Sequence, residues 1–163
     1  MSRQRSIPDA EIFAAILRLI AEGGEKAVTF SAIARATGLA APSLVQRYGA
    51  LPAMLHATFA AEWDRLDALA DHAIAEVKAE GKGPQAVLKA LTPASPALLA
   101  ATARHGDLSE RAARWRAKVQ AALATRPGGS EAAMLFAVWQ GQVLWSATGE
   151  KGFKIKDAIK RLT

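Results

Sequence analysis

The chain has 163 residues, of which 51% are apolar, and it carries a net charge of +6 at pH 7. This apolar content excludes a disordered protein, and the dominance of Ala, Leu, Glu, Lys and Arg over β-branched and aromatic residues favours an all-α fold. The chain has no cysteine, which excludes disulfides and thiolate metal sites, and its longest apolar run, 132–139, is far shorter than the roughly 20 residues that span a bilayer. We therefore expect a cytoplasmic, helical protein outside the membrane, whose positive charge favours a polyanionic partner.

The first predicted helix runs from Pro8 to about Ile20. Its apolar residues recur at intervals of three and four, which is the spacing of one helical face: Ile12, Phe13, Ile16, Leu17 and Ile20. Proline is tolerated in the first turn of a helix, and the Gly23-Gly24 pair is expected to end it.

Two shorter helices are expected next, with a glycine turn between them. Thr29 can cap a helix over Phe30–Thr37, and Gly38 can take the left-handed conformation that ends it. A third helix begins near Ala41 and is over by Gly49. Three short helices arranged in this way are typical of a helix-turn-helix unit.

The third helix has an apolar face and a face that suits the DNA major groove. At 100° per residue, Leu44 and Tyr48 point to the core and Gln46 lies opposite. A glutamine can bind adenine through two hydrogen bonds, Val45 can contact a thymine methyl group, and Ser43 suits a phosphate. The alternative, which spacing alone leaves open, is a helix-turn-helix that serves only as a packing corner.

From Ile12 to about Phe59 the sequence resembles the TetR family of dimeric transcriptional repressors. That family reads T-x-x-x-I-A-x-x-A-G-V-S, followed by a short recognition helix that ends in an aromatic residue. The matching positions here are Thr29, Ile33, Ala34, Gly38, Leu39, Ser43, Leu44 and Tyr48. The resemblance implies a DNA-binding domain over residues 1–51 and a helical effector-binding and dimerisation domain over residues 52–163.

The resemblance and the helix geometry together select the candidate DNA-binding residues: Thr29, Ser31, Ala41, Pro42, Ser43, Val45, Gln46, Arg47 and Tyr48, with Arg3 and Arg5 as a basic arm. Two positions depart from the family. Val45 stands where a tyrosine is common, and Leu51 stands where a phosphate-contacting lysine is common. Arg47 and the arm could compensate, although a solvated, disordered tail is an equal alternative for the arm.

The remainder of the chain is predicted to be helical, giving about nine helices in all. A long helix is expected over Pro52–Glu80, and a short one before Thr92. Further helices are expected over Ala97–His105, Ser109–Thr125, Ser130–Thr148 and Phe153–Leu162. By resemblance, the last two long helices form the dimer interface.

Four aromatic residues could line a pocket for a small apolar or aromatic effector: Trp63, Trp115, Phe136 and Trp139. The alternative is that they are plain core, which is the commoner fate of aromatics at helical spacing. An acidic stripe, Asp64, Asp67, Asp71 and His72, is interpreted as an exposed face rather than a metal site. We expect no metal, no cofactor and no catalytic site, because no phosphate-binding loop or nucleophile motif is present.

The sequence thus predicts a ligand-responsive, DNA-binding transcriptional regulator, most simply a repressor. A homodimer would bind a near-palindromic double-stranded DNA operator and be released by a small-molecule effector. The alternative is a helical small-molecule-binding or scaffold dimer whose DNA-binding unit has degenerated.

Overall fold

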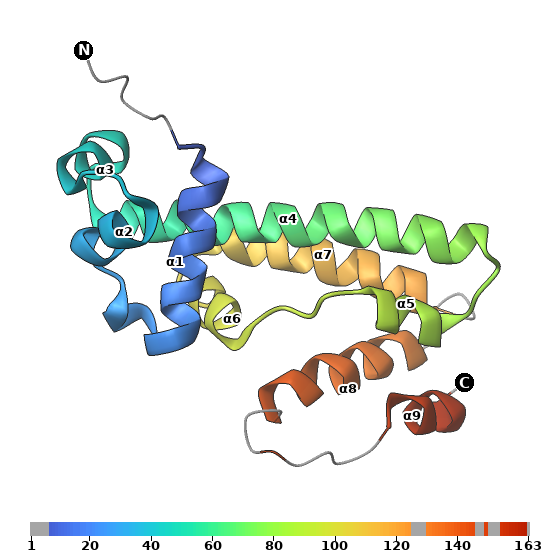
Figure 1. Cartoon of the computed structure of the whole chain (residues 1–163). Coiled ribbons are helices and arrows are strands. Elements are labelled where there is room, and N and C mark those ends of the chain that lie inside the picture. The colour runs from blue at the N-terminus through green and yellow to red at the C-terminus, as the bar shows by residue number, and fades with distance from the viewer. Residues whose placement is uncertain (1–6, 125–129, 146–148, 150–153, 163) are drawn as a thin grey trace. The chain divides into compact units, whose positions relative to one another are not determined.

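A computed structural model of the chain describes residues 7–124, 130–145, 149 and 154–162 (Figure 1). Within these ranges the protein is all-helical and has no β-strand, as the composition predicted. The α-helices are α1 (Asp9–Gly23), α2 (Phe30–Thr37), α3 (Ala41–Tyr48), α4 (Leu51–Ala79), α5 (Pro84–Ala90), α6 (Pro96–Thr102), α7 (Gly106–Leu123), α8 (Glu131–Trp145) and α9 (Ile155–Leu162). A short 3₁₀ turn, Glu25–Ala27, follows α1 and was not predicted.

The chain divides into two compact units between Glu62 and Trp63, and α4 contributes residues to both. The boundary expected from the sequence lay between residues 51 and 52, at the start of α4. The first unit therefore also includes the opening turns of α4, with the buried side chains of Met54, Thr58 and Phe59.

In the first unit, local sequence signals set the limits of the helices. The Thr29 hydroxyl oxygen accepts a hydrogen bond of 3.0 Å from the backbone N–H of Ala32, which caps α2. Gly38 ends this helix at a φ of 74°, a left-handed conformation that glycine adopts without a Cβ clash. Between the three helices lies a core of fully buried side chains: Ile12, Ile16, Ile33 and Leu44. This core fixes which face of α3 remains outside.

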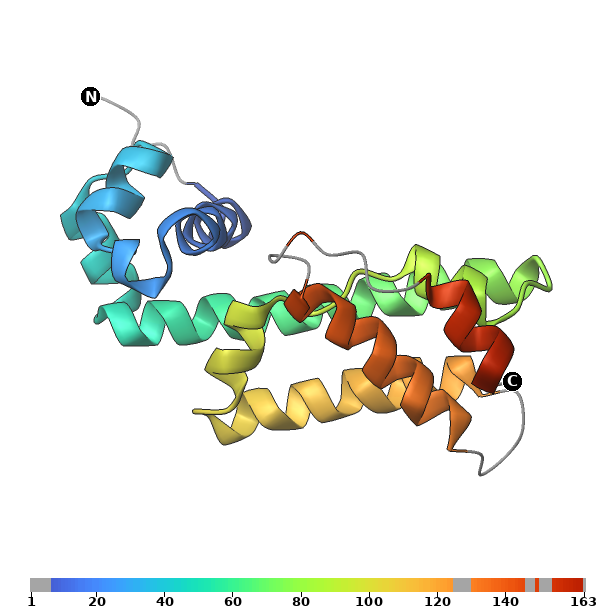
Figure 2. The same cartoon turned by 90° about the horizontal axis from the view of Figure 1, so that it is seen from below.

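In the second unit, α4 and α7 run alongside each other (Figure 1). The Arg111 side chain pairs with Asp64, and the Lys118 ammonium lies 2.8 Å from Asp67 and 2.7 Å from Asp71. The acidic stripe of α4 is therefore matched by cations of α7. Figure 2 shows α8 between α7 and α9, and it packs against both.

Two global features of the described residues bear on function. No helix among them combines the length and apolar character needed to cross a membrane. Within the same ranges, no three His, Asp or Glu side chains are grouped so that they could hold a metal ion. His72, the remaining member of the stripe weighed as a metal site, lies 3.5 Å from Glu76 in the next turn of α4.

Candidate functional site

The exposed face of α3 carries the residues that were predicted to read DNA. Leu44 is fully buried beneath the helix, whereas Val45 is 44% exposed and both Pro42 and Gln46 are exposed. Ala41 and Ser43 are half-buried. The structure therefore places an apolar anchor on one side of α3 and Gln46 on the other.

The other predicted contacts in this unit are distributed between the start of α2 and the N-terminal arm. Thr29 is exposed, but its hydroxyl oxygen is used as the cap of α2. Ser31 is exposed in the first turn of α2. Arg3 and Arg5 lie outside the described residues.

Arg47 and Tyr48, at the end of α3, are both held by the beginning of α1. The Asp9 carboxylate accepts a hydrogen bond from the Tyr48 hydroxyl and lies 2.8 Å from the Arg47 guanidinium. Arg47 also donates a hydrogen bond of 2.8 Å to the backbone carbonyl of Ile7. The Tyr48 ring packs against Phe13, with the ring centroids 6.0 Å apart. We call Asp9, Arg47 and Tyr48 the α1–α3 clasp.

The clasp changes the chemistry of Tyr48. Burial raises the pKa of the Tyr48 hydroxyl, and the hydrogen bond to the Asp9 carboxylate raises it further, because both disfavour the phenolate. Tyr48 is therefore a neutral hydrogen-bond donor at physiological pH. Sequence analysis assigned Arg47 and Tyr48 to DNA and did not anticipate Asp9, which lies about forty positions earlier and is linked to them by no local pattern.

The charge around α3 favours an anionic partner. From residue 29 to residue 61 the chain contains no aspartate or glutamate, whereas it contains Arg35 and Arg47. Arg35 is exposed in the last turn of α2. Asp9 of the clasp lies against α3 and balances Arg47. Arg35, Arg47 and Asp9 together therefore carry a net charge of +1, which Arg35 supplies.

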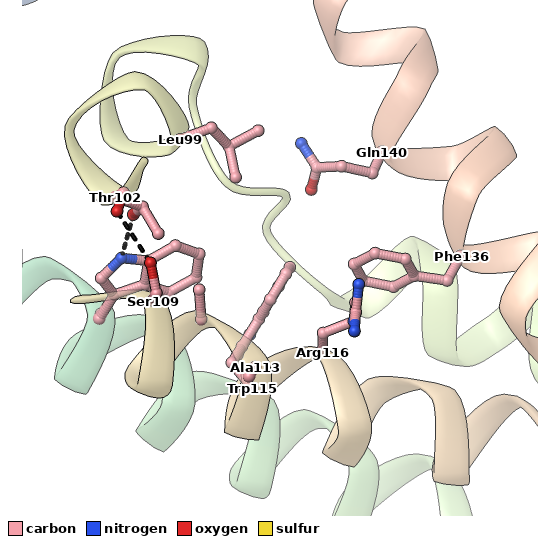
Figure 3. Close-up of a pocket in the computed structure, with 10 residues that line it drawn as sticks. Leu99, Thr102, Ser109, Ala113, Trp115, Arg116, Phe136 and Gln140 are labelled. Carbon is pink, nitrogen blue, oxygen red and sulfur yellow. Dashed lines mark hydrogen bonds between the residues drawn. The ribbon is translucent and has the colours of Figure 1, made fainter. Parts of the chain in front are cut away.

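A second candidate site is a cavity of about 380 Å³ in the second unit (Figure 3). It is lined by side chains from α4, α6, α7 and α8: Trp63, Leu99, Thr102, Ser109, Ala112, Ala113, Trp115, Arg116, Phe136 and Gln140. Its volume falls within the range of about 300 to 1,000 Å³ that is usual for small-molecule sites.

The four aromatic residues expected in a pocket are brought together by the fold. The ring of Trp115 lies 5.5 Å from Trp63, 5.7 Å from Phe136 and 6.1 Å from Trp139, measured between centroids. Trp63, Trp115 and Phe136 line the cavity. Trp139 does not; it is buried against Trp115 and Phe136 instead.

Polar side chains in the cavity wall were missed by sequence analysis. The Trp63 Nε1 atom donates to the Thr102 hydroxyl at 2.9 Å, and the Ser109 hydroxyl donates to the Thr102 carbonyl at 2.9 Å (Figure 3). Gln140, from α8, is joined through its side-chain amide to the backbone of Ala94. These residues come from separate helices, so no spacing along the sequence could have grouped them.

No protein-family model, no curated protein and no solved structure matches the chain. The candidate sites are therefore argued from the geometry described above.

Proposed function

We propose that the protein is a DNA-binding transcriptional regulator of the TetR type, with α3 as its recognition helix. The observation that carries the proposal is the exposed position of Gln46 above the fully buried Leu44. An α-helix enters the major groove when one face is anchored and the opposite face offers side chains that reach base edges. The absence of acidic residues from 29 to 61 supports the same partner.

Each exposed group of α3 has a role in this proposal. Gln46 would read adenine through its amide, and Val45 would contact a thymine methyl group. No side chain caps the start of α3, so the N–H of Ala41 is available to a phosphate oxygen. Arg47, held by Asp9, would act mainly by fixing the angle of α3 and by adding positive charge near the backbone.

Homodimerisation and effector control complete the proposal. On α8, Met134, Leu144 and Trp145 are large apolar side chains with exposures of 41%, 50% and 69%. We expect these side chains to be covered by the second copy in the dimer. A dimer would set two recognition helices about 34 to 36 Å apart, to meet successive major grooves of a near-palindromic operator. A small molecule in the cavity would shift this spacing and release DNA.

Salt-dependent DNA binding tests this proposal. We expect fluorescence anisotropy with duplex fragments from the protein's own promoter region to show binding whose log K falls with log salt at a slope of about −5, for about six phosphate contacts. A Gln46→Ala variant should keep this slope, because glutamine contacts bases rather than phosphates.

The competing function is a small-molecule-binding or scaffold dimer that no longer binds DNA. The observation that favours it is Leu51, a half-buried apolar residue at the start of α4 that cannot contact a phosphate by charge. Weak binding with little salt dependence would support this alternative and contradict the DNA-binding proposal.

A further inference from the structure

The cavity in the second unit has few polar groups, and most of them are already engaged. The Gln140 amide donates to the Ala94 carbonyl at 2.7 Å and accepts from the Ala94 N–H at 3.1 Å. The Thr102 hydroxyl accepts from Trp63 and donates to the Leu98 carbonyl at 2.8 Å. These side chains hold the wall together, and their hydrogen-bonding capacity is largely spent within the protein.

One charged hydrogen-bond donor in the wall is accessible to a ligand. Arg116, on α7, is exposed and has no ion pair among the described residues. The Nε1 atom of Trp115 also has no hydrogen-bond partner, but it is buried, so a ligand in the cavity does not reach it. Arg116 therefore favours a ligand that carries a negative charge and accepts hydrogen bonds.

Of the ten residues that line the cavity, only Arg116 is charged. Arg111 and Lys118 also belong to α7, but each is neutralised by aspartates of α4. Arg116 instead belongs to the cavity wall (Figure 3), and none of the ten lining residues is an aspartate or glutamate. The cavity thus contributes one unbalanced positive charge and no negative one.

The rest of the wall favours a ligand with a flat, apolar ring system. Trp63, Trp115 and Phe136 present aromatic rings, and Ala112 and Ala113 leave room between the helices. A cavity of about 380 Å³ is at the small end of the usual range of roughly 300 to 1,000 Å³. It therefore suits a compound of one or two rings.

We infer that this cavity binds a planar aromatic carboxylate, with its rings against the packed aromatic cluster of Trp63, Trp115 and Phe136 and its carboxylate on Arg116. Carboxylates accept from guanidinium donors, and hydrogen bonds between charged groups are the strong ones. The inference deepens the proposed function by naming the chemical class of the effector, and only its regulatory meaning depends on that function.

Calorimetric titration of the full chain with 2-naphthoate and with 2-naphthamide tests the inference without DNA. The two probes have the same rings, but only the carboxylate is charged at neutral pH. We expect 2-naphthoate to bind the protein at least about tenfold more tightly than the amide, as is typical of a charge-assisted contact.

Two variants locate the contact. Arg116→Gln should weaken 2-naphthoate by about tenfold or more and leave 2-naphthamide within about twofold. Arg114→Gln is the matched control, because Arg114 is exposed on the same helix and does not line the cavity. It should change neither affinity.

Three results would overturn the inference: no binding of 2-naphthoate, equal binding of the two probes, or equal losses in Arg116→Gln and Arg114→Gln. The same preparations are tested for DNA binding. If 2-naphthoate binds as expected but DNA does not, the proposed function fails and the cavity assignment stands. If DNA binds and 2-naphthoate does not, the reverse holds.

Discussion

Asp9 joins two side chains of α3 to the first turn of α1. The ion pair between Asp9 and Arg47 is partly solvated, because the Arg47 side chain is 38% exposed and the Asp9 side chain is 52% exposed. It therefore contributes at most about 1 kcal/mol to stability. Its main consequence is geometric. With Tyr48 bound to the same carboxylate and Arg47 also bound to the Ile7 carbonyl, the last turn of α3 is held at a fixed position on α1. The exposed face of α3 is thereby oriented.

The pKa of Tyr48 reports on the clasp, and it can be measured directly because Tyr48 is the only tyrosine of the chain. Spectrophotometric titration should show the phenolate forming well above the ordinary pKa of 10.0. The elevated pKa means that the neutral hydroxyl stabilises the fold below pH 10.0, and that this contribution is lost as the pH rises through the pKa of the folded protein.

Replacing Asp9 separates the two causes of this shift. Asp9→Asn should lower the pKa of Tyr48 but leave it above the ordinary value, because burial still disfavours the phenolate. Glu11→Gln, at another acid in the first turn of α1, is the control and should have no effect. A Tyr48 pKa that is ordinary, or unchanged in Asp9→Asn, would contradict the clasp.

At the scale of elements, local sequence signals were sufficient to predict the limits of α2 but not the start of α7. The cap at Thr29 and the glycine at 38 predicted Phe30–Thr37, which is the observed helix. Ser109 was predicted to begin α7, but its hydroxyl donates to the Thr102 carbonyl of the preceding helix, and α7 begins at Gly106. A serine near a helix start is ambiguous in sequence because its hydroxyl can serve a tertiary contact instead of the cap.

The turn between α2 and α3 depends on glycine for conformational reasons alone. A Cβ added at Gly38 would meet no atom within 4 Å, yet φ is +74°. Gly38→Ala should therefore lower the free energy of unfolding by about 1 to 2 kcal/mol through backbone strain. Gly38→Asn should cost less, since asparagine tolerates this region. Gly141→Ala, inside α8 where φ is not positive and an added Cβ meets nothing within 4 Å, is the control in chemical denaturation and should not lower the free energy of unfolding. Equal effects at the two glycines would contradict this account.

The pairing of α7 with α4 makes a separate prediction. Burial alone would lower the pKa of Lys118, but hydrogen bonds to Asp67 and Asp71 outweigh it and raise the pKa above 10.5. The ammonium group should therefore stabilise the protein from neutral pH up to pH 10.5, with the contribution lost as the pH rises further. Lys118→Gln should reduce the free energy of unfolding by up to about 1 kcal/mol at neutral pH.

Thermal unfolding at several pH values checks this prediction. The difference between the protein and Lys118→Gln should be present at neutral pH and shrink above pH 10.5. Arg114→Gln, an exposed change on the same helix, should show no such difference. A loss of stability that does not depend on alkaline pH would exclude the ammonium group as its cause.

At the scale of the whole molecule, the sequence predicted the helices better than the cavity. Periodicity found the long α4 and the aromatic residues of α7 and α8, because these are properties of single segments. The wall of the cavity combines α4, α6, α7 and α8, so Thr102, Gln140 and Arg116 gain their roles only through packing. For the same reason, sequence periodicity could not show that Trp139 packs against Trp115 and Phe136 without being among the residues that line this cavity.

In the proposed regulator, each of the two units has its own task. α3 would read DNA in the first unit, and the cavity would receive an effector in the second, with α4 contributing residues to both. Coupling between two such sites is typically about 1 to 3 kcal/mol. Operator recognition in such a regulator requires that the exposed face of α3 reads base sequence.

Selection of duplexes from a random DNA pool tests that claim most directly, with the protein, Gln46→Ala and Arg47→Ala compared. We predict enrichment of a near-palindromic site, loss of preference at one base pair of each half-site in Gln46→Ala, and uniformly weaker binding with the same preference in Arg47→Ala. Failure of the protein to enrich any sequence, or an unchanged preference in Gln46→Ala, would contradict the assignment of α3 as the recognition helix.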